Sequence, residues 1–372
     1  MSSAPDLHLS AAQQELYETT RGLAAGRLTE LARQGTPGTV NRALIRGLAE
    51  HGLLARLFTA GRLQAMDLCL VREALARDCT EAETAFALQG LGAHPVLLAG
   101  SSDLIDRWIP AVAGGEAVAA FALTEPEAGS DVAALTLTAQ PDRQTRGHRL
   151  TGSKLWISNA PDADIYTVFA RAPEGITAFA VPGDSPGLTG ERKSMLAPHA
   201  IGSLEFDGVA VPPENRLGAP GEGFKVAMRT LDLFRPSVGA FAIGMARAAL
   251  EMAVEHARTR QAFGRPLSAN QAVSHRLAEL AARTQAARLL VHQAAAAHDA
   301  GRPDRALAAM AKLLATETAQ AAVDAAVQVH GARGLEQGHP LEHLYRDVRA
   351  PRIYEGASEI QREIIARSLF GR

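Results

Sequence analysis

A single glutamate near the end of the chain, Glu355, stands where a carboxylate could act as a general base. It lies in the run Ile353-Tyr-Glu-Gly-Ala-Ser-Glu-Ile-Gln-Arg362. Ser358 followed by Gln361 has the form of a capping box, which predicts that a helix begins near Ser358. Glu355 then falls in the loop just before that helix, where Gly356 allows close backbone approach. A lone loop glutamate is usually a solvated charge, so the residue by itself does not establish catalysis.

A second segment, Phe121-Ala-Leu-Thr-Glu-Pro-Glu-Ala-Gly-Ser-Asp131, offers small hydrogen-bond donors. Its first residues form a short apolar run that is typical of a strand, and Pro126 and Gly129 end any regular element. Thr124, Ser130 and the amides around Gly129 could approach a planar ligand or a phosphate. An ordinary surface loop has the same composition.

A third segment, Gly152-Ser-Lys-Leu-Trp-Ile-Ser-Asn159, follows a turn at residues 146–148. This pattern predicts the second strand of a hairpin. Trp156 and Ser158 point to the same side of such a strand, because side chains alternate with period two. The alternative is a core tryptophan with an ordinary neighbour.

A fourth segment, Arg258-Thr-Arg-Gln-Ala-Phe-Gly264, could bind phosphate. The planar donor fork of an arginine such as Arg260 matches phosphate oxygens. An arginine at a helix end next to Phe-Gly is otherwise a solvated cap.

In order and spacing, these four segments resemble the acyl-CoA dehydrogenase family, flavoenzymes that oxidise an acyl thioester between its α and β carbons. The resemblance covers most of the chain from about residue 84 onward. It implies that Glu355 is the catalytic base and that FAD accepts the hydride from the β carbon. The backbone N–H of Glu355 would help to stabilise charge on the thioester carbonyl.

The resemblance also implies ligand contacts along the chain. Trp156 would lie beside the flavin, Thr124 and Ser158 would hydrogen-bond its ring, and Arg260 would reach the pyrophosphate across a subunit interface. The expected FAD-binding residues are Phe121, Leu123, Thr124, Gly129, Ser130, Trp156, Ile157, Ser158, Arg260, Phe263, Gln271, Gln328, Gly331, Ala332, Ala357, Ser358 and Glu359. The expected substrate-binding residues are Ser130, Asp232, Arg235 and Gly356.

Some positions depart from the family pattern. Asp232 and Arg235 have an alternative reading as helix-surface charges. Ala332 replaces a usual glycine, and Ala357 replaces a common threonine, which removes one expected hydrogen bond to FAD. Residues 54–64 lack the usual proline and paired glycines, which leaves the size of the acyl substrate open.

The composition excludes several classes of function. The 372 residues carry a net charge of −2 with a pI of about 6.6 and no long basic run, which argues against nucleic acid as the main partner. Two cysteines cannot form a disulfide framework, and no H-E-x-x-H or C-x-x-C pattern supports a metal site. The N-terminus has no secretion signal, and no uninterrupted apolar stretch reaches the ~18 residues of a membrane span. A cytoplasmic enzyme is expected.

Three regions differ in texture. Residues 1–117 are rich in Ala, Leu, Glu and Arg and predict a helical domain. Residues 118–220 contain short β-rich runs beginning at Leu135, Ile165, Ile176 and Leu204, which predict a small antiparallel β-domain. Residues 221–372 return to helical periodicity and predict a domain resembling a four-helix bundle.

We therefore expect an α+β fold that is mostly α, with a helical, β, helical order. This is the architecture of the family. The resemblance implies a homotetramer that oxidises an acyl-CoA and passes its electrons to an electron-transfer flavoprotein. Three alternatives stay open: a dehydrogenase of carrier-protein thioesters, an O₂-using flavin relative, and a non-catalytic helical binding protein.

Overall fold

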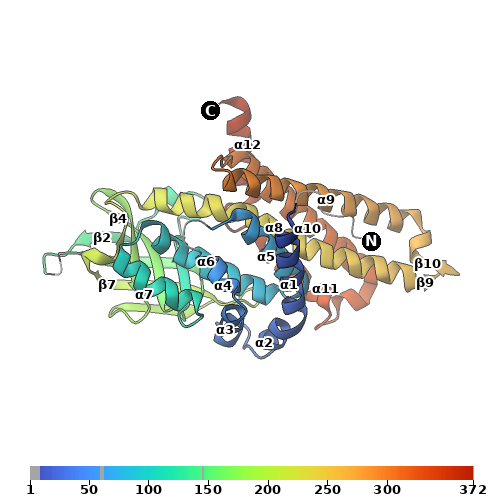
Figure 1. Cartoon of the computed structure of the whole chain (residues 1–372), viewed down its shortest axis with the longest axis horizontal. Helices are drawn as coiled ribbons and strands as arrows, with labels where there is room; N and C mark the ends of the chain where they lie inside the picture. Colours follow the sequence, from blue (N-terminus) through green and yellow to red (C-terminus); the bar gives the residue numbers. More distant parts are fainter. Residues whose placement is uncertain (1–8, 59–62, 145, 372) are drawn as a thin grey trace. The chain divides into compact units, whose positions relative to one another are not determined.

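The computed structural model describes residues 9–58, 63–144 and 146–371, which form two compact units (Figure 1). Unit 1 comprises Met1–Thr29, Gln64–Glu83 and Asp232–Arg372, and unit 2 comprises Glu30–Leu63 and Thr84–Leu231. The first helices are divided between these units, so the units do not follow the predicted boundaries at residues 117 and 220. The three-domain division stays a prediction.

Unit 1 is almost entirely helical. Its helices are α1 (Ala11–Leu23), a π-helical turn (Ala24–Leu28), α5 (Ala65–Asp78), α9 (Gln271–Asp299), α10 (Arg305–His330), α11 (Pro340–Asp347) and α12 (Ser358–Phe370). The long helix α8 (Gly223–Thr259) belongs to unit 1 from Asp232 onward, and α6 (Thr80–Ala99) belongs to it up to Glu83. A short hairpin of β9 (Gln261–Ala262) and β10 (Arg265–Pro266) joins α8 to α9. Short 3-10 turns lie at Leu267–Ala269, Gly331–Leu335 and Ala350–Arg352.

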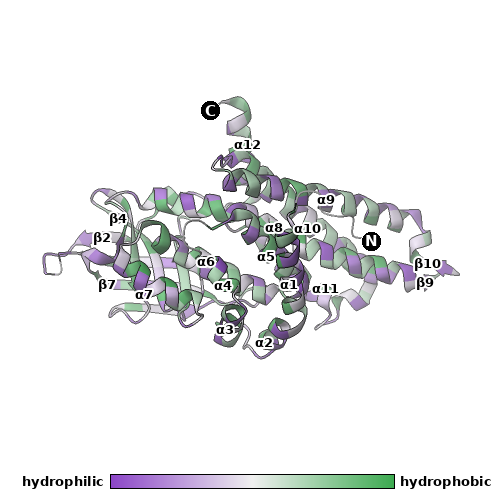
Figure 2. Ribbon diagram, viewed as in Figure 1, coloured by the Kyte–Doolittle hydropathy of each residue, from purple (hydrophilic) through white to green (hydrophobic). Residues whose placement is uncertain are grey.

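Small residues let the helices of unit 1 pack closely. Helix α10 buries an alanine stripe at helical spacing: Ala308, Ala311, Ala315, Ala319, Ala322 and Ala326. A Cβ added at Gly239 of α8 would lie 2.7 Å from Val291 of α9, and one at Gly244 would lie 2.5 Å from the carbonyl of Glu73 on α5. Helices α8, α9 and α10 run side by side, and hydrophobic and hydrophilic residues alternate along them (Figures 1 and 2). The expectation of a four-helix-bundle-like packing is confirmed, with α5 as a member.

Unit 2 is built on a sheet with the strand order β6-β7-β3-β2-β4-β5-β8, to which β1 adds by pairing with β4. The strands are β1 (Ala119–Ala122), β2 (Thr138–Pro141), β3 (His148–Ser158), β4 (Ile165–Ala172), β5 (Gly175–Pro182), β6 (Leu188–Arg192), β7 (Ile201–Val211) and β8 (Arg216–Leu217). The helices of this unit are nearly all of α2 (Thr29–Arg33), α3 (Arg42–Glu50), α4 (Leu53–Arg56), the rest of α6 and α7 (Ser102–Ala113). Short 3-10 turns lie at Val132–Ala134 and Pro213–Asn215.

The sheet differs from the prediction in two respects. It is mainly antiparallel, but β1 pairs with β4 in parallel, as does Thr138 of β2 with Arg171. The run that begins at Leu135 becomes a strand only at Thr138. Its first part stays outside the ladder because the amides of Thr136 and Leu137 donate to the Glu125 carboxylate instead of to a strand.

Helix α8 is long and apolar enough to cross a membrane by length and composition alone. However, 72% of its most apolar window is buried inside the protein, as in the core helix of a folded domain. Both cysteines, Cys69 and Cys79, are free and buried, which agrees with the expectation of two thiols without a disulfide framework.

Candidate active site

The loop that carries Glu355 lies between the 3-10 turn Ala350–Arg352 and helix α12, as the sequence predicts. Glu355 (φ 50°) and Gly356 (φ 91°) both have left-handed backbone conformations. A side-chain-bearing residue rarely adopts this conformation, and such residues concentrate at functional sites. A Cβ added at Gly356 would lie 2.6 Å from Gln361 Nε2, so a larger residue would displace that side chain, and the positive φ favours glycine at this position.

The predicted capping box is wrong, although the helix begins where it was expected. Ala357 is the N-cap of α12 and Ser358 is the first helical residue. Ser358 Oγ donates to Glu317 Oε1 (2.7 Å), a stronger acceptor than a neutral group. Gln361 Nε2 turns back and donates to the carbonyl of Gly356 (2.7 Å). Both side chains therefore hold the loop instead of capping the helix.

One oxygen of the Glu355 carboxyl group is shielded from water. The residue is half-buried, but its Oε2 atom is shielded from solvent and accepts no hydrogen bond from the described residues. Burial raises the pKa of this carboxyl group, and attraction to Arg72, Lys312 and Arg235 offsets only part of the effect. A carboxylate with a raised pKa is a stronger base, which is what proton abstraction from carbon requires.

Arg72 of α5 is a buried cation near Glu355 that the sequence analysis missed. Its Nε donates to the buried Glu83, and its Nη1 donates to Ser237 Oγ (2.6 Å). Arg72 and Lys312 share one sequence signal, because each places a charge within an apolar run of a helix. A charge at a buried helix position needs a partner, and this requirement could have flagged both residues.

Asp232 and Arg235, the predicted substrate-binding pair, bind each other. Arg235 Nη1 donates to Asp232 Oδ1 (2.9 Å), and Arg305 Nε donates to Asp232 Oδ2 (3.0 Å). Arg235 is buried, so the alternative of a helix-surface charge does not hold for it. Its Nε is buried without a hydrogen-bond partner, which leaves one donor for a ligand. Asp232 is occupied by two arginines and is poorly suited to act as a base.

In unit 2, the segment after β1 is tied to strand β3. Leu155 N donates to the carbonyl of Thr124 (3.0 Å), and the buried Lys154 Nζ donates to the carbonyl of Leu123 (2.9 Å) and to Glu125 (2.8 Å). These bonds bring Thr124 next to the strand that carries Trp156. The first and third predicted segments therefore meet, as a shared ligand site would require.

Trp156 lies at a β-bulge, which simple strand alternation does not predict. The pairing of β3 with β7 shifts register between Lys154 and Ile157, and Trp156 has a φ of 59°. Lys154 and Ile157, three residues apart, are both buried, whereas the Trp156 side chain is 49% exposed. A core tryptophan is thereby excluded. Bulges often re-aim a side chain beside a site, and this one leaves the Trp156 indole about half exposed.

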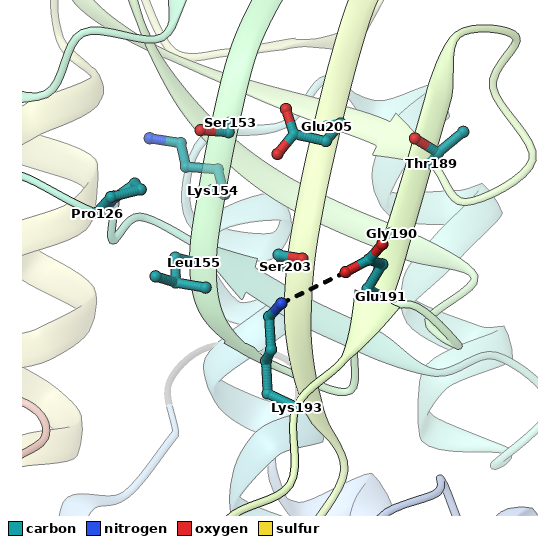
Figure 3. Close-up of a pocket in the computed structure, with 10 residues that line it drawn as sticks. All are labelled: Pro126, Ser153, Lys154, Leu155, Thr189, Gly190, Glu191, Lys193, Ser203 and Glu205. Carbon is teal, nitrogen blue, oxygen red and sulfur yellow. Dashed lines mark hydrogen bonds and ion pairs between the residues drawn. The ribbon is translucent and has the colours of Figure 1, made fainter.

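A polar pocket of about 460 Å³ adjoins this segment on β3, β6 and β7 (Figure 3). Figure 3 shows Lys193 and Glu191 paired at one side and Glu205 on the central strand. Pro126 and Leu155 belong to its lining, but Thr124, Trp156 and Ser158 do not. The pocket is therefore adjacent to the predicted ligand contacts and distinct from them.

In unit 1, the end of α8, which leads into the predicted segment at residues 258–264, meets the end of α10, which leads into the predicted FAD contacts Gly331 and Ala332. The ring of His256 stacks on that of His330 at 4.2 Å between centroids, and His339 lies against His330 at 5.5 Å. Burial lowers the pKa of His256, and the neighbouring His330, Arg260 and Arg333 lower it further. The lowered pKa favours the neutral form of His256, so Arg260 and Arg333 supply the positive charge where a diphosphate was predicted to bind.

The other predicted FAD contacts occupy the following positions. Gly129, Ser130, Phe263, Gln271, Gln328, Gly331, Ala332 and Glu359 are exposed, Phe121 and Ala357 are half-buried, and Leu123 and Ile157 are buried. Phe263, at the tip of the β9–β10 hairpin, is 99% exposed. These positions are compatible with ligand contact, but the individual contacts stay predictions.

Comparisons with known proteins match nearly all of the chain. The family models described as the N-terminal, middle and C-terminal domains of acyl-CoA dehydrogenase match residues 10–116, 120–209 and 221–370. Cyclohexane-1-carbonyl-CoA dehydrogenase of Geobacter metallireducens is 35% identical over 95% of this chain and 96% of its own length.

Two solved structures show the same fold. A chain in a structure described as the electron transferring flavoprotein of Acidaminococcus fermentans superposes with a TM-score of 0.92, at 32% identity, and covers 99% of this chain and 100% of that chain. Butyryl-CoA dehydrogenase of Megasphaera elsdenii superposes with a TM-score of 0.91, also at 32% identity, and covers 98% of this chain and 100% of that chain.

Proposed function

The chain belongs to the acyl-CoA dehydrogenase family, and we propose that it removes one hydrogen from each of the α and β carbons of a saturated acyl-CoA thioester, which leaves the trans-2-enoyl-CoA. Glu355 carries this proposal. It lies in a loop with left-handed backbone conformation, and one of its carboxylate oxygens is buried without a hydrogen-bond partner among the described residues. Such an oxygen is available to take up a proton.

Proton abstraction is the step that the residues of this chain perform. The Glu355 carboxylate takes the proton from the α carbon, and the electron pair of that C–H bond becomes one bond of the new double bond. The backbone N–H of Glu355 is the donor that the family resemblance assigns to the thioester carbonyl, where negative charge develops. A bound acyl chain would exclude water further and would strengthen the base.

FAD is the cofactor of this proposal, and the residues present fit it. The bulge at Trp156 offers an indole face beside Thr124 for a planar ring, and the group around Arg260 offers cations for a diphosphate. When bound, FAD accepts a hydride from the β carbon of the substrate, which completes the loss of two hydrogens.

The physiological context is proposed with the activity, and its electron acceptor and assembly are those that the family resemblance implies. The electrons pass to an electron-transfer flavoprotein. The subunits assemble as a homotetramer in which Arg260 reaches the cofactor of a neighbour, and the enzyme works in the cytoplasm. A structure described as an electron transferring flavoprotein, among those with the same fold, supports this choice of electron acceptor.

The alternative activities predict different results. A carrier-protein dehydrogenase would prefer the carrier-bound thioester to the CoA thioester, and an O₂-using relative would turn over without an added electron acceptor. A binding protein would purify without yellow flavin. A panel of straight and branched acyl-CoA thioesters, assayed with an artificial electron acceptor, separates these cases and defines the acyl group.

Replacement of the base tests the central assignment. Glu355→Gln preserves size and removes the ionisable group, so we expect retained FAD and acyl-CoA binding with turnover lower by about 100- to 10,000-fold. Flavin bleaching in a single-turnover mixture with substrate measures the loss. Flavin reduction at the wild-type rate would rule out Glu355 as the base.

A further inference from the structure

Lys312 of α10 is a fully buried cation whose hydrogen bonds converge on the base loop. Its side chain is 0% exposed. Its Nζ donates to the carbonyl of Tyr354 (3.1 Å) and to the carbonyl of Gly356 (2.7 Å). These are the residues immediately before and after Glu355, so a single ammonium group bridges the two sides of the base.

Gln361 of α12 completes the support from the other direction. It is also fully buried, and its Nε2 donates to the same Gly356 carbonyl that Lys312 binds. The Gly356 carbonyl therefore accepts from two side chains on two helices. The left-handed turn at Glu355 and Gly356 persists only if its surroundings hold it, and these donors provide the restraint.

We propose that Lys312 and Gln361 are positioning residues that fix the Tyr354–Gly356 turn, and through it the Glu355 carboxylate, in the geometry for proton abstraction. The inference rests on the proposed role of Glu355 as the base. Neither residue contacts the reacting atoms in this proposal. Lys312 acts through two backbone carbonyls and through its charge, whereas Gln361 acts through hydrogen bonding alone.

The charges around the turn make the two roles separable. Glu355 faces Arg72 from α5, Arg235 from α8 and Lys312 from α10, and the Tyr354 phenol lies on its own loop. Burial lowers the pKa of Lys312 to about 8, which leaves the group charged at neutral pH. The nearby cations lower the pKa of Glu355 and so oppose the effect of burial. Removal of the Lys312 charge should therefore raise the pKa of Glu355.

Two variants of the FAD-loaded enzyme test the proposal. Lys312→Met removes donor and charge, and we expect kcat to fall by about 10- to 100-fold, because a misplacement of about 1 Å has effects of that size. The acid limb of the kcat/KM profile should also move to higher pH. Gln361→Met removes the neutral donor only, so kcat should fall while the acid limb stays in place.

A structural readout accompanies the kinetics. Hydrogen–deuterium exchange of peptides spanning residues 352–360 should accelerate in both variants. Lys225→Met, a change at an exposed lysine paired with Glu222, serves as the matched control and should leave exchange and kinetics unchanged. If Lys312→Met does not fold, Gln361→Met alone decides, through its kcat and its exchange.

The possible outcomes are distinct. Wild-type kcat, or wild-type exchange of the loop, in the variants that fold would overturn the positioning role. Failure of the underlying function shows elsewhere, because Glu355→Gln would then remain active. A Glu355→Gln enzyme that is inactive beside a fully active Lys312→Met enzyme would leave the base in place and remove the proposed restraint.

Discussion

The features of Glu355 that suit a catalytic base also lower the stability of the folded chain. Its carboxyl group is drawn into a site that disfavours the charged form, and its backbone has the left-handed conformation that side-chain-bearing residues avoid. Neither feature benefits the folded state. The burial suits a base that must hold a proton more strongly than an exposed carboxylate does, and the backbone conformation shapes the loop that presents it.

We therefore expect Glu355→Gln to stabilise the protein at neutral pH. Because burial raises the folded-state pKa of Glu355, the native state binds more protons than the unfolded state between the unfolded value, about 4.5, and the raised folded value. The wild type consequently loses stability as pH rises through this window, whereas the glutamine variant does not. Melting temperatures from pH 4 to pH 8 measure the difference.

The gain should be largest at the alkaline end and should vanish below about pH 4, where both side chains are neutral. The opposite trend would be a stability difference that becomes less favourable to the glutamine variant between pH 4 and pH 8. That result would show that Arg72, Lys312 and Arg235 favour the carboxylate more than burial opposes it.

At the residue scale, the sequence identified groups by their motif but not by their surroundings. Glu355, Trp156 and Arg260 were located because segments of known spacing contain them. Gln361 was identified only as part of a capping box that the structure does not form, and Arg72 and Lys312 had no predicted role until the folded chain placed them near the base loop. The contacts of Arg72 and Lys312 join segments far apart in the chain, which local patterns do not report.

At the scale of elements, one buried carboxylate links several helices of unit 1. Glu73 of α5 accepts from Arg288 of α9 (2.8 Å) and from Arg247 of α8 (2.6 Å). Arg247 also donates to Tyr17 of α1 (2.9 Å). Burial alone would raise the pKa of Glu73, but His292, Arg288 and Arg247 outweigh it and hold the pKa well below the usual range.

Glu73→Gln should therefore destabilise the protein by about 3–5 kcal/mol, because it leaves buried arginines without their counter-charge. The wild-type contribution is present above the unfolded pKa of about 4.5 and is lost as pH falls toward the depressed folded value. The variant should thus show a shallower loss of stability in acid. Denaturant unfolding at pH 7 and at pH 4 measures both effects.

Glu255→Gln, at an exposed ion pair with Arg258, is the matched control and should change stability by less than about 1 kcal/mol. Equal effects of the two substitutions would show that the Glu73 cluster does not join the helices.

Element types were more predictable than their pairing. The helical stripes and the β-rich runs at residues 165–170 and 176–181 formed helices and strands as expected, because periodicity is a local property. The parallel pairing of β1 with β4 and the bulge at Trp156 depend on partners distant in sequence. The buried pair of Lys154 and Glu125 lies beside that bulge, and neither residue signals it alone.

At the scale of the whole molecule, the boundaries indicated by composition differ from the boundaries of the compact units. Composition changes near residues 118 and 221, where helices give way to strands and strands to helices. The units instead gather residues that bury one another, so α1 and α5 belong with the C-terminal helices. Composition reflects the type of an element, whereas compactness reflects long-range burial, which no local window contains.

Arg260 is the residue at which the proposed cofactor site and subunit assembly would be linked. Arg260 and the hairpin tip at Phe263 are exposed, and the 99% exposure of Phe263 leaves its ring accessible to a ligand or another subunit. If Arg260 holds the diphosphate of a neighbouring subunit's FAD, cofactor binding and subunit association stabilise each other by mass action. Arg260→Ala should then release flavin and shift the protein to smaller species in light scattering.

The matched control is Arg258→Ala, which removes an exposed arginine two residues earlier that pairs with Glu255. It should leave both flavin content and mass unchanged. Added FAD should restore the larger assembly of Arg260→Ala at concentrations well above those that saturate the control, because the lost contact weakens binding without removing the remaining contacts. An Arg260→Ala protein that stays fully yellow and fully assembled would show that Arg260 is only a helix-end charge, and that cofactor and assembly are independent at this position.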